Sequence, residues 1–521
     1  MARFFNTSGP CRPVDHYMLP PERRLPELLS LVEQQQYFVV HAARQSGKTT
    51  AMLAFAERLR GMGYVAAWTT LETSQGVTDP AFAEPQWLSS LGLTTRHVLP
   101  ESDRPPELAF VQDQPVGERL RHALAAWSER VAPRPVVLLL DEADVVTGPA
   151  LVSLLRQLRA GFTDRGPGRF PSSVALIGMR DLRDYLAAAK DGLPVNPGSP
   201  FNIKSDSLTL RNFSEAEVAE LYAQHTQDTG QPFTAAAVAR AYYWTGGQPF
   251  LVNALARKLV TELAPDPTCE IDAPMVDGAK ERLILSRTTH LDALTERLKE
   301  PRVARIVQAV LAGDIPRTIP YDSDDFQYVV DLGLLRRGPE GAEPANPLYR
   351  EILARQVTYN TQESLTRPWW RWQTPDGGLD LPALVDAFLG WWRENADALV
   401  EDIPLYPEAV PHIAFMAFLQ RVVNGGGKVL REYAGGRRAV DLVVEYGPDR
   451  FVIELKRVRP RDGLDTVRQG GIVQLSAYLD LLGVAEGWLI VFDQRPGLTW
   501  EERLWREEVE VDGRRLWIRG A

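Results

Sequence analysis

Residues 41–50, HAARQSGKTT, have the residue types and spacing of a loop that binds phosphate. In the pattern G-x-x-x-x-G-K-[ST], Gly47, Lys48 and Thr49 match, whereas Ala42 replaces the first glycine. Lysine reaches the terminal phosphates in such loops, and the threonine hydroxyl binds Mg²⁺. Alanine at positive φ costs about 1–2 kcal/mol, so the loop tolerates Ala42 even there. The residues expected to contact the nucleotide are Ala43, Arg44, Gln45, Ser46, Gly47, Lys48, Thr49 and Thr50.

A second stretch, PVVLLLDEADVV at residues 135–146, supplies acidic groups. Its uninterrupted apolar run predicts a strand buried on both faces of a parallel sheet, with Asp141 at the carboxyl end. Asp141 would hold Mg²⁺ through water, and Glu142 would orient the water that attacks the terminal phosphate. Alone, an acidic pair often starts a helix and SGKTT could lie on a solvated loop. Together the two motifs predict an ATP or GTP site.

Two further stretches could complete this site. SSVALIGMRD predicts a strand that ends in Arg180, which either senses a terminal phosphate or forms an ordinary surface ion pair. The turn Gly247-Gln248-Pro249 precedes an amphipathic helix and could close over the nucleotide. In this order, the motifs of residues 35–260 resemble those of AAA+-like P-loop ATPases of the STAND and archaeal-ATPase kind. The resemblance implies that the nucleotide drives oligomerisation or a conformational switch.

A third group of residues that could take part in catalysis lies in RRAVDLVVEYGPDRFVIELKRVRPR. The GPD turn between two apolar runs predicts a β-hairpin, and Glu454 and Lys456 share one face of its second strand. Counting back from the turn places Asp441 opposite them to within a residue or two. Two carboxylates on a half-buried sheet are costly unless they bind a cation such as Mg²⁺. The trio suits phosphodiester cleavage, although Glu-x-Lys alone would favour a charged solvent face.

The next segment, GGIVQLSAYLDLLGV, predicts a helix with Gln474 and Tyr478 on one face. The pattern D…ExK…QxxxY resembles the PD-(D/E)XK nuclease superfamily, over about residues 405–495. The resemblance implies that Lys456 assists the nucleophile and that Gln474 supports the site. The ligands that it implies for Mg²⁺ or Mn²⁺ are Asp441, Glu454 and the carbonyl of Leu455.

Residues around this hairpin could add a metal ligand and a DNA surface. The upstream helix YPEAVPHIAFMAFLQRVVN offers Glu408, either as a further acidic ligand or as an ordinary charge at a helix N-terminus. In a chain of net charge −10, the local basic excess predicts a track for DNA phosphates, although several members could be solvated surface charges. These basic residues are Arg431, Arg437, Arg438, Lys456, Arg457, Arg459, Arg461 and Arg468.

Length and composition limit the remaining classes of protein. The 521 residues exceed one hydrophobic core, and two distant cysteines exclude a disulfide framework or a cysteine metal site. Apolar runs fall short of the roughly 20 residues that span a bilayer, and no signal-peptide core is present, which predicts a cytoplasmic protein without a membrane partner. The expected α/β domains are an ATPase at 1–265, a helical winged-helix domain at 266–365 and a nuclease-like domain at 380–521.

The expected protein is therefore a soluble fusion that uses ATP and Mg²⁺ and carries a metal-dependent DNA nuclease. Nucleotide would regulate cleavage, as in mobile-element or phage-defence systems, and the ATPase domain could form a homo-oligomer. The alternative is a STAND-type nucleotide switch whose C-terminal fold binds nucleic acid or a partner without cutting it. A helicase-like motor is disfavoured because no repeated motor domain is evident.

Overall fold

The computed structural model describes most of the chain and divides it into two compact units. Unit 1 comprises Met1–Thr288, Asp322–Arg336 and Ala345–Leu348, and unit 2 comprises the remainder. The three-domain division expected from the sequence stays a prediction. The described residues are 3–165, 168–179, 204–286, 296–311, 323–338, 341–353, 372, 374, 378–402, 410–423, 427–434, 439–447 and 449–521.

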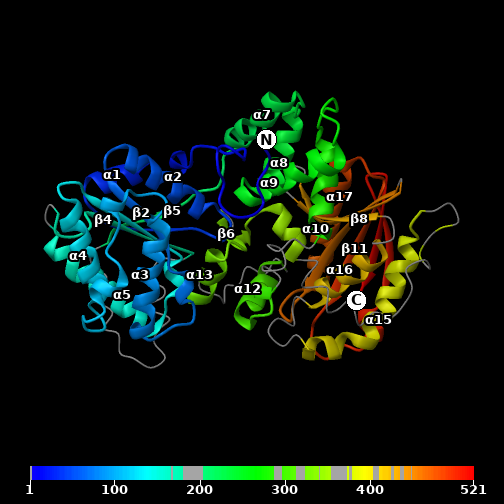
Figure 1. Ribbon diagram of the computed structural model, residues 1–521. Coiled ribbons are helices and arrows are strands. Elements are labelled where there is room, and N and C mark those ends of the chain that lie inside the picture. The colour runs from blue at the N-terminus through cyan, green and yellow to red at the C-terminus, as the bar shows by residue number, and fades with distance from the viewer. Residues whose placement is uncertain are drawn as a thin grey trace. The chain divides into compact units, whose positions relative to one another are not determined.

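A five-stranded parallel sheet lies at the centre of unit 1 (Figure 1). Its strand order is β2-β3-β4-β1-β5. The apolar strands β3 and β4 are buried along their whole length, which confirms the strands predicted at these positions. The parallel arrangement requires cover on both faces. The strands are β1 (Tyr37–His41), β2 (Val65–Thr70), β3 (Val136–Asp141), β4 (Ser173–Gly178) and β5 (Lys204–Thr209).

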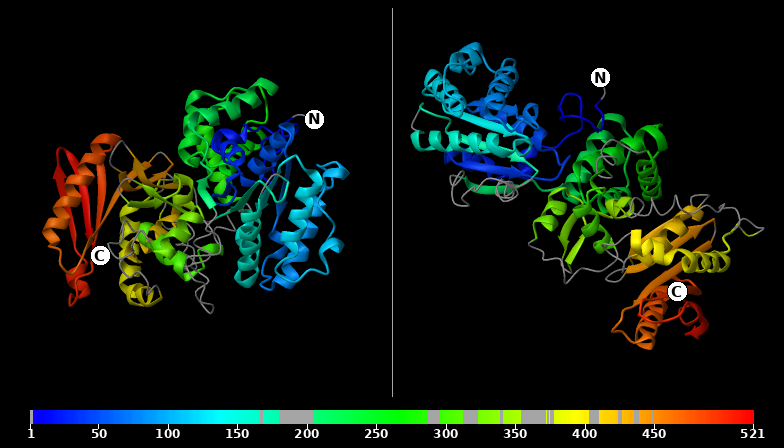
Figure 2. Two further views of the ribbon diagram at one scale, coloured as in Figure 1. Left: turned by 90° about the vertical axis from the view of Figure 1, so that its left-hand side faces the viewer. Right: turned by 90° about the horizontal axis from the view of Figure 1, so that it is seen from below.

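Helices cover both faces of this sheet (Figure 2). Alternate residues of β1 point to opposite faces, so Tyr37 and Val39 enter one core while Phe38 and Val40 enter the other. The helices are α1 (Leu28–Glu33), α2 (Lys48–Gly61), α3 (Pro80–Thr95), α4 (Arg119–Val131) and α5 (Gly148–Asp164). Short 3-10 turns are η1 (Pro21–Arg24), η2 (Glu72–Ser74), η3 (Glu101–Asp103), η4 (Leu108–Val111) and η5 (Ala143–Val145).

Beyond β5, unit 1 continues as a helical subdomain with a core of its own. It contains α7 (Glu215–Thr229), α8 (Ala235–Thr245), α9 (Pro249–Lys258), the π-helical turn η6 (Leu259–Leu263) and α10 (Ala273–Leu285). Phe5 and Tyr17 from the start of the chain belong to the same core. A capping box of Ser214 and Glu217 begins α7, because each satisfies a backbone N–H group of the first turn.

The middle of the chain contributes α12 (Pro301–Leu311), α13 (Asp324–Asp331) and the paired strands β6 (Leu335–Gly338) and β7 (Gly341–Pro344). The Ser323 side chain caps α13 by accepting a hydrogen bond from the Phe326 amide. The winged-helix assignment of residues 266–365 stays a prediction.

Unit 2 contains a six-stranded mixed sheet in the order β12-β13-β11-β10-β9-β8. Its strands are β8 (Gly427–Ala434), β9 (Ala439–Tyr446), β10 (Asp449–Val458), β11 (Glu486–Asp493), β12 (Arg506–Val511) and β13 (Arg514–Gly520). The helices are α15 (Leu381–Asp402), α16 (Val410–Val423), α17 (Leu464–Leu482) and α18 (Trp500–Arg503).

The two faces of β10 meet different helices. Ile453 and Leu455 join a core with α15 and α16, whereas Val452 and Val458 join a core with α17. By the same alternation, Glu454 and Lys456 lie on the α17 face. Within the described part of the chain, no helix has the length and apolar composition that crossing a membrane requires.

Candidate functional site

The loop between β1 and α2 has the backbone of a phosphate cradle. Gln45 and Gly47 take positive φ values of 57° and 86°, and Gly47 is the N-cap of α2. Such alternation turns successive amide groups toward one point, where the helix N-terminus also favours an anion. Ala42 is not among the residues with positive φ. Its replacement of the usual glycine therefore introduces no backbone strain.

Lys48 and Thr49 lie where the motif predicts. Lys48 is 7% exposed, and its Nζ donates to the carbonyl oxygens of Ala42 at 2.8 Å and Ala43 at 3.1 Å. Burial lowers the pKa of Lys48, against the opposing field of the nearby acidic residues. The Thr49 hydroxyl donates to Asp141 Oδ2 at 2.7 Å, across 92 residues of sequence. The structure thus brings both predicted magnesium ligands together.

Asp141 has two further hydrogen-bond donors. The indole Nε1 of Trp68, on β2, donates to the same Oδ2 at 3.1 Å, and the Glu142 amide donates to Oδ1 at 3.0 Å. No motif signals Trp68, because its position depends on the pairing of β2 with β3. Only a tryptophan near the end of a neighbouring apolar strand could have suggested this contact.

Glu142 has a left-handed backbone with φ of 54°, a conformation that is uncommon for residues other than glycine. Burial raises the pKa of Glu142, and the carboxylate of Asp144 raises it further. Asp144 Oδ2 also accepts a hydrogen bond from the Met179 amide at 3.2 Å, which joins the ends of β3 and β4. Arg180, the next residue, lies outside the described residues, so its predicted role is untested.

The Gly247-Gln248-Pro249 turn lies against the phosphate loop. Gln248 caps α9 by accepting from the Leu251 amide at 2.7 Å, and its Nε2 donates to the Gln45 carbonyl at 3.4 Å. Gly247 has a φ of 70°, and a Cβ atom there would lie 2.0 Å from the Phe213 carbonyl oxygen. Only glycine therefore permits this turn.

The segment after α13 also reaches the phosphate loop. A Cβ atom on Gly333, which has a φ of 76°, would lie 2.5 Å from the Cβ atom of Ala43. The sequence offers no sign of this contact beyond a glycine at a helix end. Close backbone approach explains why a glycine stands there.

The residues of this loop fit a magnesium nucleotide. Besides the Thr49–Asp141 pair, the Ser46 hydroxyl is buried and lacks a hydrogen-bond partner among the described residues. Buried hydroxyl groups are normally bonded, so an unsatisfied one in a loop of inward amides suits an anionic ligand.

In unit 2, the predicted residues of the hairpin and helix form one hydrogen-bonded chain. Ile453 pairs with Leu442, so continuing the register places Asp441 opposite Glu454. Asp441 Oδ2 accepts from the Leu455 amide at 2.8 Å. Lys456 Nζ donates to Glu454 Oε1 at 2.6 Å and to Gln474 Oε1 at 2.8 Å.

The electrostatics of this cluster centre on Glu454, which is fully buried. Burial, followed by the field of Asp441, raises the pKa of Glu454 to about 7, whereas Lys456 opposes the rise. Glu454 Oε2 is buried and has no hydrogen-bond partner among the described residues. Two carboxylates with an unsatisfied oxygen fit a hard cation, whose charge would offset theirs.

The described residues supply two of the carboxylates expected at this site. They contain no group of three histidine, cysteine or acidic residues placed to hold a metal. Glu408 lies outside them, and the carbonyl of Leu455 stays a predicted ligand. Gln474 Nε2 donates to the Tyr478 hydroxyl at 2.9 Å, which orients the amide oxygen toward Lys456.

Gly471 permits α17 to approach this cluster. A Cβ atom there would lie 2.8 Å from Leu489 Cδ1 and 3.1 Å from Lys456 Cγ, whereas Gly470 faces open space. Absence of a side chain at 471 therefore brings Gln474 within hydrogen-bond distance of Lys456.

The predicted basic track is only partly described. Arg459 and Arg461 are exposed, but Arg468 forms an ion pair with Glu507 of β12. Arg437 and Arg438 and the side chain of Arg431 lie outside the described residues. Lys456, another member of the predicted track, is paired with Glu454, so neither Lys456 nor Arg468 is a free positive charge.

No family model and no curated protein matches the chain. Among solved structures, the Walker-type ATPase PABY2304 of Pyrococcus abyssi is 13% identical, with 67% of this chain and 99% of that chain covered and a TM-score of 0.49. The RuvB Holliday junction branch migration motor of Thermotoga maritima is 13% identical, with 64% and 92% covered and a TM-score of 0.33. Drosophila ORC bound to DNA is 15% identical, with 63% and 74% covered and a TM-score of 0.33.

Proposed function

We propose that unit 1 binds ATP with Mg²⁺ and hydrolyses the terminal phosphate. The observation that carries this proposal is the 2.7 Å hydrogen bond between Thr49 and Asp141, beside the buried Lys48. Thr49 would bind the metal directly and Asp141 would hold it through water. Magnesium supplies positive charge against the developing charge of the phosphates.

The other residues of the loop have roles that follow from their positions. Lys48 would exchange the carbonyls of Ala42 and Ala43 for phosphate oxygens, which satisfies its charge better. The inward amides around Gly47 would bind the same phosphates. Glu142, whose pKa is raised by burial, would orient the attacking water and accept its proton, because a base works best when its pKa approaches the working pH.

Binding and turnover test this proposal directly. The wild-type chain should bind ATP in a titration calorimeter and release phosphate with Mg²⁺ but not with a chelator. Lys48→Ala should lose both ATP binding and phosphate release. Lys258→Ala should behave as the wild type, because Lys258 forms a surface ion pair with Glu262. Equal ATP affinity and hydrolysis in Lys48→Ala and the wild type would overturn the proposal.

A second activity, metal-dependent cleavage of DNA, is proposed for unit 2 because Glu454 Oε2 is buried beside Asp441 and Lys456 and no described residue donates a hydrogen bond to it. Asp441 and Glu454 would hold Mg²⁺ or Mn²⁺, and Lys456 would assist the nucleophile. Gln474 would hold the lysine in place. The order α16, β8, β9, β10, α17, β11 keeps a strand after the QxxxY helix, as the resemblance to PD-(D/E)XK nucleases implies.

Purified protein incubated with linear, circular and single-stranded DNA tests this activity. The design varies Mg²⁺, Mn²⁺, chelator and ATP, and cleavage should need a divalent metal. DNA binding without products under every condition would instead favour the nucleotide switch that does not cut. We further propose that ATP regulates DNA cleavage, either by promoting a homo-oligomer or by changing the position of the nuclease domain. Such regulation would suit a protein of a mobile element or of phage defence.

A further inference from the structure

In the part of the chain that the structure describes, two crossings connect the α/β core of unit 1 with the helical subdomain. Leu19 belongs to the core of the helical subdomain and Leu25 to the core beside β1, so the first crossing is residues 20–24. Leu210 belongs to the core beside β1 and Ser214 caps α7, so the second crossing is residues 211–214. Any rotation of the helical subdomain must bend both crossings.

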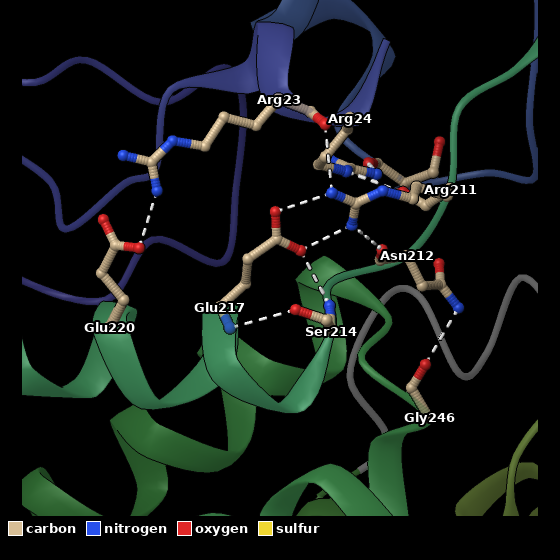
Figure 3. A network of polar contacts seen from close by, with 9 residues as sticks. Arg23, Arg24, Arg211, Asn212, Ser214, Glu217, Glu220 and Gly246 are labelled. Atoms are coloured by element: carbon tan, nitrogen blue, oxygen red, sulfur yellow. Dashed lines mark hydrogen bonds and ion pairs between the residues drawn. The ribbon is translucent and has the colours of Figure 1, made fainter. Parts of the chain in front are cut away.

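Arg24 joins the two crossings to the phosphate loop. Arg24 is 6% exposed. Nε donates to the Arg211 carbonyl at 2.7 Å, and Nη2 donates to the Ser46 carbonyl at 2.8 Å. Arg211 Nη2 donates back to the Arg23 carbonyl at 3.1 Å. One buried side chain therefore links the first crossing to two other segments of backbone, and its contact with Arg211 appears in Figure 3.

Arg211 extends this connection into α7 (Figure 3). Its guanidinium donates to both oxygens of Glu217, at 2.6 and 2.8 Å. Glu217 Oε2 also accepts from the Ser214 amide at 2.8 Å as part of the capping box. These hydrogen bonds, led by that from Arg211, lower the pKa of Glu217 to about 2. The first turn of α7 is thus attached to the second crossing.

The connection returns to the phosphate loop by another route. The Phe213 amide donates to the Gly247 carbonyl at 2.9 Å, and Asn212 Nδ2 donates to the Gly246 carbonyl at 3.2 Å. Gln248 Nε2 then donates to the Gln45 carbonyl at 3.4 Å. The neighbouring carbonyls of Gln45 and Ser46 therefore accept hydrogen bonds from Gln248 and Arg24, respectively. These two bonds close a ring of hydrogen bonds through the second crossing.

We propose that Arg24 is a positioning residue that couples nucleotide at the phosphate loop to α7 and the Gly247-Gln248-Pro249 turn, a role that rests on the proposed ATP binding. A guanidinium presents its donors in a rigid fork, so it can satisfy both carbonyls only in one relative arrangement. Burial lowers the pKa of Arg24 to about 10, which still leaves it charged at neutral pH. Movement of the Ser46 carbonyl must therefore break a charge-assisted bond or carry the second crossing with it.

Hydrogen exchange with and without ATP and Mg²⁺ tests this coupling. The variant Arg24→Met keeps the aliphatic stem and removes the donors. The matched control is Arg23→Met, because Arg23 is half exposed and its side chain pairs with Glu220 of α7. ATP should slow exchange in α7 and residues 246–251 in the wild type and in Arg23→Met.

In Arg24→Met, ATP should bind about tenfold more weakly, as expected for loss of a hydrogen bond to a charged group. At saturating ATP, the phosphate loop should still be protected while α7 is not. Arg24→Lys keeps the charge but cannot span the carbonyls of Arg211 and Ser46, so it should lose part of the coupling. It replaces Arg24→Met in the test if circular dichroism shows that Arg24→Met does not fold.

The outcomes separate the two ideas. ATP-dependent protection of α7 in Arg24→Met or Arg24→Lys equal to that of the wild type would overturn the role of Arg24 and leave ATP binding intact. A wild-type chain that binds no ATP would overturn the proposed function itself, and the coupling with it.

Discussion

Asp141 accepts hydrogen bonds from Thr49, Trp68 and the Glu142 amide, so its carboxylate has one preferred orientation. In the proposed complex, the Thr49 hydroxyl turns to the metal and one of the three bonds is lost. Trp68 and the Glu142 amide then remain to hold the carboxylate. The indole of Trp68 should therefore matter most when magnesium is scarce.

Trp68→Phe should raise the Mg²⁺ concentration for half-maximal ATP hydrolysis about tenfold or more, since a hydrogen bond to a charged group such as the Asp141 carboxylate contributes about 1.5–3 kcal/mol. The rate at saturating Mg²⁺ should change little. A magnesium titration at fixed ATP measures both. Trp127→Phe is the control, because that indole also loses a hydrogen bond, to the Asp103 carbonyl, away from Asp141. Identical magnesium curves for both variants would remove Trp68 from the site.

Glu142→Gln should leave ATP affinity near the wild-type value and slow hydrolysis about 100-fold or more, because only the water-orienting base is lost. Calorimetry and a phosphate-release assay separate the two quantities. Equal loss of binding and hydrolysis would instead assign Glu142 a structural role, which its left-handed backbone would then explain.

At the scale of elements, the distance between α17 and β10 controls the cluster in unit 2. Gly470 and Gly471 make a matched pair, because only the second faces a crowded surface. Gly471→Ala should destabilise the protein by about 1–3 kcal/mol through overpacking against Leu489 and Lys456. It should also lower DNA cleavage by moving Gln474 away from Lys456.

Gly470→Ala should stabilise the protein by about 0.5–1 kcal/mol, as expected for alanine in a helix interior, and leave cleavage unchanged. Unfolding temperatures and cleavage rates of the two variants provide the comparison. Similar behaviour of both would mean that close packing of α17 is not what positions Gln474.

The first turn of α7 should show acid-sensitive stability. The pKa of Glu217 is lowered to about 2 from an ordinary value of 4.5, chiefly by Arg211, so folding favours the ionised form. The stabilisation is present above about pH 4.5 and is lost as the pH falls toward 2. Solvent near the pair limits its size to about 1–2 kcal/mol.

Glu217→Gln should therefore lower the urea midpoint at pH 6, and its difference from the wild type should shrink as the pH falls from 4.5 toward 2. Glu220→Gln is the control, because Glu220 forms a more exposed pair with Arg23. A difference between Glu217→Gln and the wild type that stays constant with pH would show that the ion pair does not contribute as expected.

At the scale of the whole molecule, the two proposed sites lie in separate units with separate cores. Asp441→Ala, Glu454→Ala or Lys456→Ala should each remove DNA cleavage while ATP hydrolysis stays near the wild-type rate. Lys48→Ala distinguishes the models of regulation. Loss of cleavage in Lys48→Ala would mean that ATP controls the nuclease, since a useful fusion needs a coupling free energy between sites. Retained cleavage would mean two independent activities.

Metal dependence supplies the control for that experiment. Cleavage should require Mg²⁺ or Mn²⁺ and stop with a chelator, because the carboxylates of Asp441 and Glu454 need a cation. Cleavage that persists in chelator and in Asp441→Ala would place the nuclease site elsewhere or in a contaminant.

The sequence by itself determined features whose causes act over a few residues. An apolar strand, a glycine-containing loop and a helix in succession predicted the phosphate loop, and turn chemistry with alternation predicted the hairpin that brings Asp441 and Glu454 together. These predictions succeed because backbone sterics and the period of two in a strand are local rules.

Only the tertiary structure decided which distant residues join those motifs. Trp68 reaches Asp141 across 73 residues because β2 pairs with β3, and Arg24 reaches Ser46 because two crossings of the chain meet beside the loop. Ala42 was ambiguous in sequence and is resolved by its backbone conformation. Strand order and the packing of cores depend on many weak contacts summed over the chain, so no short pattern specifies them.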